Sequence, residues 1–147
     1  MDRLNAAWDE IRRDGAAVLF RGESPAGNEG LFFPITILDN PPYDAHYVSQ
    51  ENFGPLRSII KYRTVEEAIQ KANDTPYGLG ASVWGRDPAT LDAVARQLEA
   101  GTVWINQHIN PHPDVPFTGH KTSGLGVQFG PEGLREFCNL QIIATRR

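Results

Sequence analysis

The sequence has little of what marks several classes of protein. Its 147 residues contain one cysteine, Cys138, so no disulfide forms within the chain, and we expect a reducing compartment, the cytoplasm. No apolar run approaches the roughly 20 residues that span a bilayer. The opening stretch MDRLNAAWDEIRRDG is amphipathic and charged, without the apolar core of a secretion signal. We therefore expect neither secretion nor a membrane partner.

Positive charge is also scarce. Lys and Arg number 14 against 18 Asp and Glu, which gives a formal net charge of −4. The only basic clusters are short pairs, Arg12-Arg13 and Arg146-Arg147. A duplex-binding surface needs concentrated Lys and Arg. We therefore expect no nucleic-acid partner.

Three segments carry apolar residues at i, i+3, i+4 and i+7, the spacing of a single stripe on a helix. They are Leu4–Ile11, Val65–Ala72 and Leu91–Leu98. Capping signals precede the last two: Thr64 is followed by Glu67 in a capping-box pattern, and Asp87 is followed by Pro88. The sequence thus predicts three amphipathic helices.

A fourth, shorter helix is expected to begin at Pro131 and to face inward with Leu134, Phe137 and Cys138. A lone cysteine in an enzyme is sometimes a nucleophile, but a reactive thiolate needs an electropositive, partly open setting. Because Cys138 falls on the inward stripe, we interpret it as a packing residue.

β-branched or aromatic runs alternate with the helices. They lie at 16–20, 35–38, 56–62, 79–84, 102–105 and 140–144. From residue 56 onward the order is strand, helix, strand, helix, strand, which indicates βαβ crossovers. The sequence predicts an α/β fold: a mostly parallel sheet with flanking helices, in a chain long enough for one ordinary domain.

The segment PFTGHKTSGLG, residues 116–126, resembles a phosphate loop at first sight. A Walker loop needs Gly-x4-Gly-Lys-Ser/Thr directly between a strand and a helix. Here a histidine separates Gly119 from Lys121, and the later glycines do not directly follow a strand. We conclude that this segment does not cradle a phosphate. The surrounding residues 106–130 form a long irregular stretch, which is uncommon in a compact domain unless it has a function.

The four histidines do not have the spacing of a metal site. His108 and His112 are four apart, but the prolines around them prevent the helix that would align them. No second pair of Cys or His completes a set of four ligands. We interpret these histidines, with His46 and His120, as solvated side chains and expect no metal.

SQENFGPL, residues 49–56, places a carboxylate two positions from an aromatic ring. If this segment is extended, Glu51 and Phe53 share a face. A carboxylate can accept hydrogen bonds from both hydroxyls of a ribose, and an aromatic edge can border a nicotinamide ring. The spacing alone fits a solvated Glu beside a core Phe better, because such pairs are common in extended segments. Both interpretations stay open at this point.

Five segments in series carry a resemblance to a known family. ENFGP, NDTPYGLGASVW, LEAGTVWINQ, PFTGHKTSGLG and GPEGLREF occur in this order and at spacings that resemble the C-terminal part of the NAD(P)-dependent aldehyde dehydrogenase superfamily. The likeness runs from about Leu4 to the end of the chain. Each motif is moderately specific, and the series is very specific.

The resemblance implies a division of the chain and a set of site residues. Residues 1–138 are expected to form part of the catalytic domain, and residues 139–147 the C-terminal strand of the oligomerisation extension. Glu51 and Phe53 take the roles of binding the nicotinamide ribose and bordering the nicotinamide of NAD or NADP. Phe117 lines the aldehyde pocket, and Asn106 with the loop beyond it forms the rest of that wall. The glycines of SGLG then serve backbone packing near this pocket.

The resemblance also implies what the chain does not supply. The family oxidises a small-molecule aldehyde to a carboxylic acid through a cysteine thiohemiacetal and thioester. The motifs of the nucleophile, the general-base Glu and the Rossmann domain belong to upstream sequence, so we expect no turnover and no tight cofactor binding by this chain alone. Expected partners are the missing N-terminal part or a second copy.

An alternative is a non-catalytic assembly module that pairs through its C-terminal strand with itself or with full-length relatives. Two departures from the family pattern stand out. Thr118 replaces a usual Gly and is expected to crowd its loop, and Val127-Gln128 replaces the commoner Arg-Glu pair.

Overall fold

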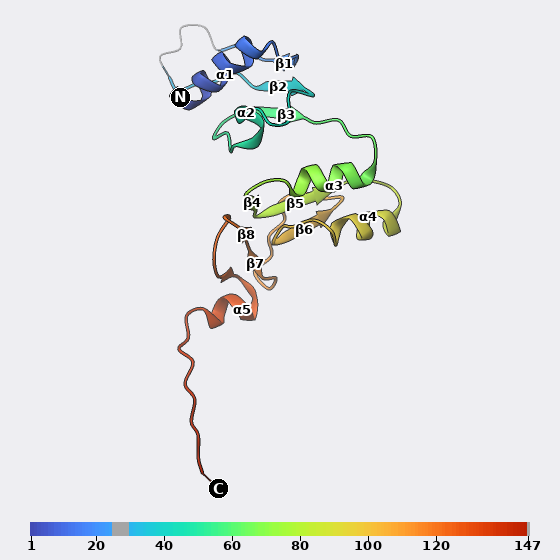
Figure 1. The fold of residues 1–147 in the computed structure, drawn as a ribbon. Coiled ribbons are helices and arrows are strands. Elements are labelled where there is room, and N and C mark those ends of the chain that lie inside the picture. The colour runs from blue at the N-terminus through green and yellow to red at the C-terminus, as the bar shows by residue number, and fades with distance from the viewer. Residues whose placement is uncertain (25–29, 147) are drawn as a thin grey trace. The chain divides into compact units, whose positions relative to one another are not determined.

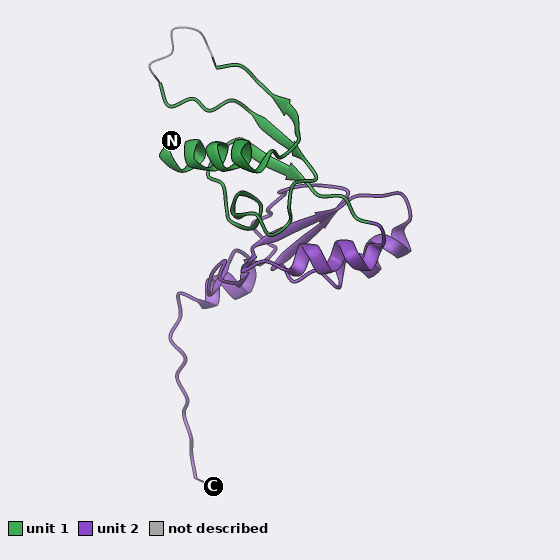
Figure 2. Ribbon diagram, turned by 45° about the horizontal axis from the view of Figure 1, so that its top comes forward, with its two compact units in different colours: residues 1–62 green, residues 63–147 purple. Residues whose placement is uncertain are grey.

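The computed structural model describes residues 1–24 and 30–146, which fall into two compact units, 1–62 and 63–147 (Figure 2). In its described residues the first unit holds two helices and a three-stranded sheet (Figure 1). In chain order its elements are α1 (Asp2–Asp14), β1 (Val18–Arg21), β2 (Thr36–Asp39), α2 (His46–Ser49) and β3 (Leu56–Ile59). β1 pairs antiparallel with β2, and β2 pairs parallel with β3.

The core of the first unit lies between α1 and the sheet. The predicted stripe of α1 is buried at Leu4, Ala7 and Ile11, which confirms both the helix and its inward face. The residues packed against this stripe include Leu38 and Leu56 of the sheet. Tyr47 of α2, Leu38 and Leu56 are each at most 1% exposed, so α2 is tied to the same core.

Residues 63–146 of the second unit carry three more helices and six short strands (Figure 1). They are α3 (Val65–Asn73), β4 (Tyr77–Gly78), β5 (Gly80–Val83), α4 (Pro88–Ala95), β6 (Thr102–Ile105), β7 (Phe117–Thr118), β8 (His120–Lys121), β9 (Val127–Gln128) and α5 (Gly130–Arg135). β5, α4 and β6 form one βαβ crossover, since β5 and β6 are parallel with Gly80 opposite Thr102 and Val83 opposite Ile105. The predicted α/β class is confirmed. The short ladders β4–β8 and β7–β9 are antiparallel.

The capping signals act as the sequence predicts. The Thr64 hydroxyl accepts a hydrogen bond from the Glu67 N–H at 3.2 Å, while the Glu67 carboxylate accepts one from the Arg63 N–H at 2.8 Å. Hydrogen bonds from Lys71 and from Arg63 lower the pKa of Glu67 to about 2. At α4, the Asp87 carboxylate accepts from the Thr90 N–H at 2.9 Å. The capping contacts therefore fix where α3 and α4 begin.

The fourth helix forms, but its predicted inward face is wrong. Leu134 is 70% exposed, Phe137 is 91% exposed, and Cys138 lies beyond the helix and is exposed. The packed side of α5 is Gly133, where an added Cβ would lie 2.7 Å from the carbonyl carbon of Gln128. The helix approaches the chain through a glycine, so the apolar stripe faces away.

Residues 139–146 form no helix or strand in the part of the chain that the structure describes. Leu140, Ile142 and Ile143 are each more than 80% exposed. A strand exists only against a partner strand, so the C-terminal strand and the boundary at residue 138 stay predictions. Among the described residues, no helix is both long and apolar enough to cross a membrane.

Candidate functional site

The ENFGP turn is fixed to the core of the first unit. The Asn52 side-chain amide donates a hydrogen bond to the carbonyl oxygen of Tyr47 at 2.8 Å, and the Asn52 carbonyl accepts from the Gly54 N–H at 2.8 Å. Gly54 lies directly on α1, because an added Cβ would overlap Cδ1 of Leu4 and come within 2.9 Å of its Cδ2. A larger residue at position 54 would have to displace the Leu4 side chain.

The two predicted cofactor residues project from this fixed turn. Glu51 is exposed and its carboxylate has no partner among the described residues, while Phe53 is 79% exposed. The exposure of Phe53 therefore disagrees with the alternative interpretation, in which Phe53 is a core residue. The turn bends at Phe53 rather than running on as a strand, so whether the two side chains share a face stays a prediction.

Asn106 lies where β6 ends, at the carboxyl ends of the parallel strands β5 and β6. Its backbone is left-handed, with φ of 53°. Its amide accepts a hydrogen bond from the Gly85 N–H at 2.9 Å and donates to the Gly85 carbonyl at 3.0 Å. Asn106 thus ties the end of β6 to the loop after β5. The amide is occupied by the protein itself.

Phe117, in β7, is half-buried. Its ring lies 6.4 Å from the ring of Trp104, tilted by 33°. β7 pairs with β9, so Phe117 stands opposite Gln128 and Thr118 opposite Val127. The replacement Val127-Gln128 is therefore part of a strand that backs β7.

Thr118 stabilises its loop, although we expected its side chain to crowd that loop. Its hydroxyl donates a hydrogen bond to the carbonyl oxygen of Gly126 at 2.8 Å. The space that the Thr118 backbone needs comes from another motif. A Cβ on Gly101 would overlap the Thr118 carbonyl oxygen and lie 2.6 Å from its carbon. Gly101, the glycine of LEAGT, thus leaves the room that the Thr118 backbone of PFTG occupies.

Lys121 explains why PFTGHKTSGLG cannot serve a phosphate. Its ammonium donates to the carbonyl oxygens of Asn73 at 2.5 Å and Thr75 at 3.1 Å, and it pairs with the Glu99 carboxylate at 2.8 Å. The cation therefore sits on the C-terminal end of α3, where a positive charge is favoured.

The two residues after Lys121 bind the same region of the chain. The Thr122 hydroxyl donates to the Pro76 carbonyl at 2.6 Å, and the Ser123 hydroxyl accepts from the Gly78 N–H at 2.8 Å. The Lys-Thr-Ser triplet that resembles an anion site is therefore engaged with the protein's own turn at residues 73–78.

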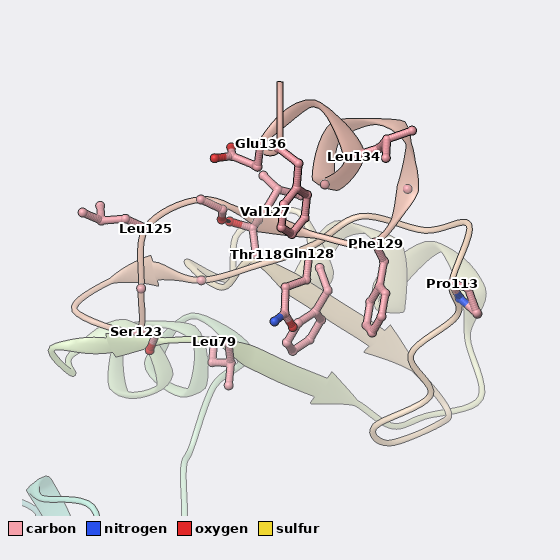
Figure 3. A pocket seen from close by; sticks show the side chains of 17 residues that line it. Leu79, Pro113, Thr118, Ser123, Leu125, Val127, Gln128, Phe129, Leu134 and Glu136 are labelled. Atoms are coloured by element: carbon pink, nitrogen blue, oxygen red, sulfur yellow. Dashed lines mark hydrogen bonds between the residues drawn. The ribbon is translucent and has the colours of Figure 1, made fainter. Parts of the chain in front are cut away.

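A hollow of about 730 Å³ lies between Leu79, residues 117–119, the loop 123–130 and α5 (Figure 3). Phe117 is among its lining residues, and Asn106 is not. In Figure 3 the Leu125 side chain points away from the other labelled side chains, in agreement with its full exposure. The structure therefore places one of the two predicted substrate residues at this hollow.

A contact between Ser82 and His108 could not be predicted from the sequence, because the two residues are 26 positions apart. The Ser82 hydroxyl and the His108 Nδ1 lie 2.7 Å apart, and the His108 ring meets Trp104 edge-on with centroids 6.3 Å apart. His108 is exposed but not simply solvated as expected. No three His, Cys, Asp or Glu side chains gather as a metal site within residues 1–24 and 30–146.

Cys138 corrects the packing prediction. It is exposed rather than buried, and its thiol lies 3.7 Å from the Leu134 carbonyl oxygen, to which it donates. The physical reason is the same as for α5 as a whole: Gly133 takes the packed side of the helix.

The chain is thus an α/β segment. Asn106 and the start of the loop after it lie at the carboxyl ends of the parallel strands β5 and β6, which is where such folds bind ligands. A model of the aldehyde dehydrogenase family matches residues 1–143, and the chain belongs to this family. A putative aldehyde dehydrogenase of Gibberella fujikuroi is 48% identical over 136 residues, 92% of this chain and 29% of that protein. One of Staphylococcus saprophyticus is 43% identical over 145 residues, 97% of this chain and 30% of that protein.

Solved structures agree. An aldehyde dehydrogenase of Mycobacterium tuberculosis complexed with NAD+ superposes with a TM-score of 0.86 and 35% identity, covering 92% of this chain and 28% of that one. A betaine aldehyde dehydrogenase of Staphylococcus aureus in complex with NAD+ gives 0.85 with the same identity and coverage. The chain spans less than a third of the length of the relatives it matches.

Proposed function

We propose that this chain forms part of the catalytic domain of an NAD(P)-dependent aldehyde dehydrogenase, which oxidises an aldehyde to a carboxylic acid. The observation that carries the proposal is the ENFGP turn, which is fixed to the core yet leaves Glu51 and Phe53 projecting. The names of the relatives, and the NAD+ held by the solved neighbours, support it.

The residues of the turn fit one edge of a nicotinamide nucleotide. A carboxylate such as that of Glu51, which has no partner within residues 1–24 and 30–146, can accept hydrogen bonds from two neighbouring ribose hydroxyls, and charged acceptors form the stronger bonds. The exposed Phe53 ring gains from being covered, because burying apolar surface is worth about 25 cal/mol per Å². The bound cofactor supplies the hydride acceptor.

The substrate wall is proposed to run along β7 and the loop before it. Phe117 contributes an apolar ring at the 730 Å³ hollow. Asn106 contributes by holding the first residue after β6 against Gly85, so that the loop beyond starts from a fixed point. This is a supporting role, since both polar atoms of its amide are already engaged.

The catalytic thiol, the general base and the dinucleotide-binding fold are proposed to come from the remainder of the enzyme. Cys138, the one cysteine, does not match the nucleophile's motif and lies beyond the short helix α5, outside the hollow's lining. By the complete enzyme we mean this chain together with that remainder. We expect NAD-dependent aldehyde oxidation from the complete enzyme and none from the 147 residues alone.

The substitution Glu51→Gln tests the proposed cofactor edge. Glutamine keeps the size but removes the charge, and hydrogen bonds to charged groups are worth about 1.5–3 kcal/mol, so we expect the KM for NAD(P) to rise at least about tenfold. The KM for the aldehyde should stay unchanged. Steady-state kinetics of the complete enzyme measure both.

The matched control is Glu23→Gln, another exposed glutamate of the first unit, which should leave both constants unchanged. An unaltered KM for the cofactor in the Glu51→Gln enzyme would contradict the proposed role.

A second proposal concerns assembly. Leu140, Ile142 and Ile143 are exposed on residues 139–146, which have no ladder partner in the described chain. Exposed apolar residues with unpaired backbone groups favour strand addition by another chain. We expect light scattering of this chain to give a mass above 16.3 kDa that rises with concentration, and Ile142→Asp to lower it. A strict monomer at high concentration would rule the proposal out.

A further inference from the structure

We infer that Asn52 is a positioning residue that holds Glu51 and Phe53 in place for the cofactor, an inference that rests on the function proposed above. Asn52 stands between the two projecting side chains. Its own side chain is engaged with α2, because its Nδ2 donates to the Tyr47 carbonyl oxygen at 2.8 Å.

The Tyr47 carbonyl is a suitable anchor because α2 is only one turn long. The last carbonyls of a helix lack partners within the helix, and here the Gln50 N–H takes the His46 carbonyl, while the Asn52 amide takes that of Tyr47. Tyr47 itself is 1% exposed and packs in the cluster that includes Leu4 and Ile11 of α1. The ENFGP turn is therefore held at a fixed position relative to the core of the first unit.

The other side of the turn is held independently. The Gly54 carbonyl accepts hydrogen bonds from the Leu56 N–H at 2.9 Å and from the Arg57 guanidinium at 2.9 Å. Gly54 also rests on Leu4, whose side chain an added Cβ would have to displace. Loss of the Asn52 amide bond therefore frees the Glu51 side of the turn, while the part after Phe53 stays fixed.

The consequence is a preorganised cofactor edge. A carboxylate on a mobile segment loses conformational freedom when it binds a ribose, and this ordering reduces affinity. Because the Asn52 bond fixes the segment in advance, the reduction is smaller. Asn52 has no predicted contact with the cofactor, so its effect passes entirely through its neighbours.

Asn52→Asp provides the test in the complete enzyme. Aspartate has the same shape but no Nδ2 donor, so the Tyr47 carbonyl loses its hydrogen bond from residue 52. The negative aspartate carboxylate also lies beside the partial negative charge of that carbonyl oxygen. A lost hydrogen bond of about 1 kcal/mol predicts a KM for NAD(P) raised about fivefold. We expect the KM for the aldehyde to be unchanged. Asn52→Ala, which removes the donor without adding charge, should give the same split.

The matched control is Gln50→Glu, which adds the same charge on the other side of Glu51, on an exposed side chain. We expect it to leave the KM for NAD(P) unchanged. Equal effects of Gln50→Glu and Asn52→Asp would overturn the inference, as would an equal rise of both KM values in Asn52→Ala. If Glu51→Gln raises the KM for NAD(P) and neither Asn52 variant does, the inference fails alone. If Glu51→Gln has no effect, the proposed function fails.

Discussion

Replacing Gly101 by alanine is expected to destabilise the second unit by about 3 kcal/mol, at the upper end of the usual cost of overpacking. The added Cβ would overlap the carbonyl oxygen of Thr118, and backbone cannot move aside as a flexible side chain does. The Gly101 N–H is also bonded to the Gly78 carbonyl at 2.9 Å, so β6 cannot retreat without losing that bond. Denaturant unfolding of the 147-residue chain, followed by tryptophan fluorescence, measures the change.

Gly22→Ala is the control for this substitution. A Cβ at Gly22 would meet its nearest atoms at 3.8 Å, an ordinary contact, and its φ is not in the left-handed region. The free energy of unfolding should then stay within about 1 kcal/mol of the parent, with a small gain possible from a stiffer unfolded chain. Similar results for Gly22→Ala and Gly101→Ala would show that the close approach of the two motifs is not formed.

Lys121→Met is expected to lower the free energy of unfolding by about 2–3 kcal/mol. Methionine keeps much of the length and the apolar stem but removes the ammonium that bonds the Asn73 and Thr75 carbonyls and the Glu99 carboxylate. The two carbonyls then lose a charged donor, and α3 loses the positive charge at its C-terminal end. The same unfolding experiment measures this loss.

Lys61→Met is the comparison for Lys121→Met. Lys61 pairs with Asp39 at 2.8 Å with its side chain 65% exposed, so it represents an exposed ion pair, which is worth at most about 1 kcal/mol. Lys121, with a side chain 24% exposed, should cost more. Equal losses would mean that Lys121 is only another surface charge and that the site geometry around residues 73–78 does not depend on it.

The elements of the fold follow from local sequence. The stripe of α1, the Thr64 and Asp87 caps and the βαβ order are properties of neighbouring residues, and each appears where the sequence predicts it. The face of α5 does not. An apolar stripe predicts burial only if the helix packs through its large side chains, and α5 packs through Gly133 instead. The spacing of apolar residues takes no account of glycine, so the packed face of α5 could not be predicted from that spacing.

The candidate site, like the fold, could be predicted only in part from the sequence. Family motifs name Glu51, Phe53, Asn106 and Phe117, and the exposure of Phe53 agrees with a binding role, although that role stays a proposal. The contacts that hold these residues were not predictable, since they join positions far apart in the chain. Thr118 is an example: from the motif alone it is an oversized replacement for glycine, yet its hydroxyl finds the Gly126 carbonyl.

The contacts on either side of residues 107–115 have a consequence for changes within this segment. Before the loop, Asn106 is fastened to Gly85; after it, Thr118 rests on Gly101 and Lys121 on the end of α3. Residues 107–115 lie between these points and have contacts of their own, since His108 lies against Ser82 and the Pro113 carbonyl accepts a hydrogen bond from the Gly130 N–H. Changes in length between His108 and Pro113 then cost only a little closure entropy. We therefore expect insertions and deletions between residues 109 and 112 to leave the flanking contacts of Asn106, Thr118 and Lys121 in place.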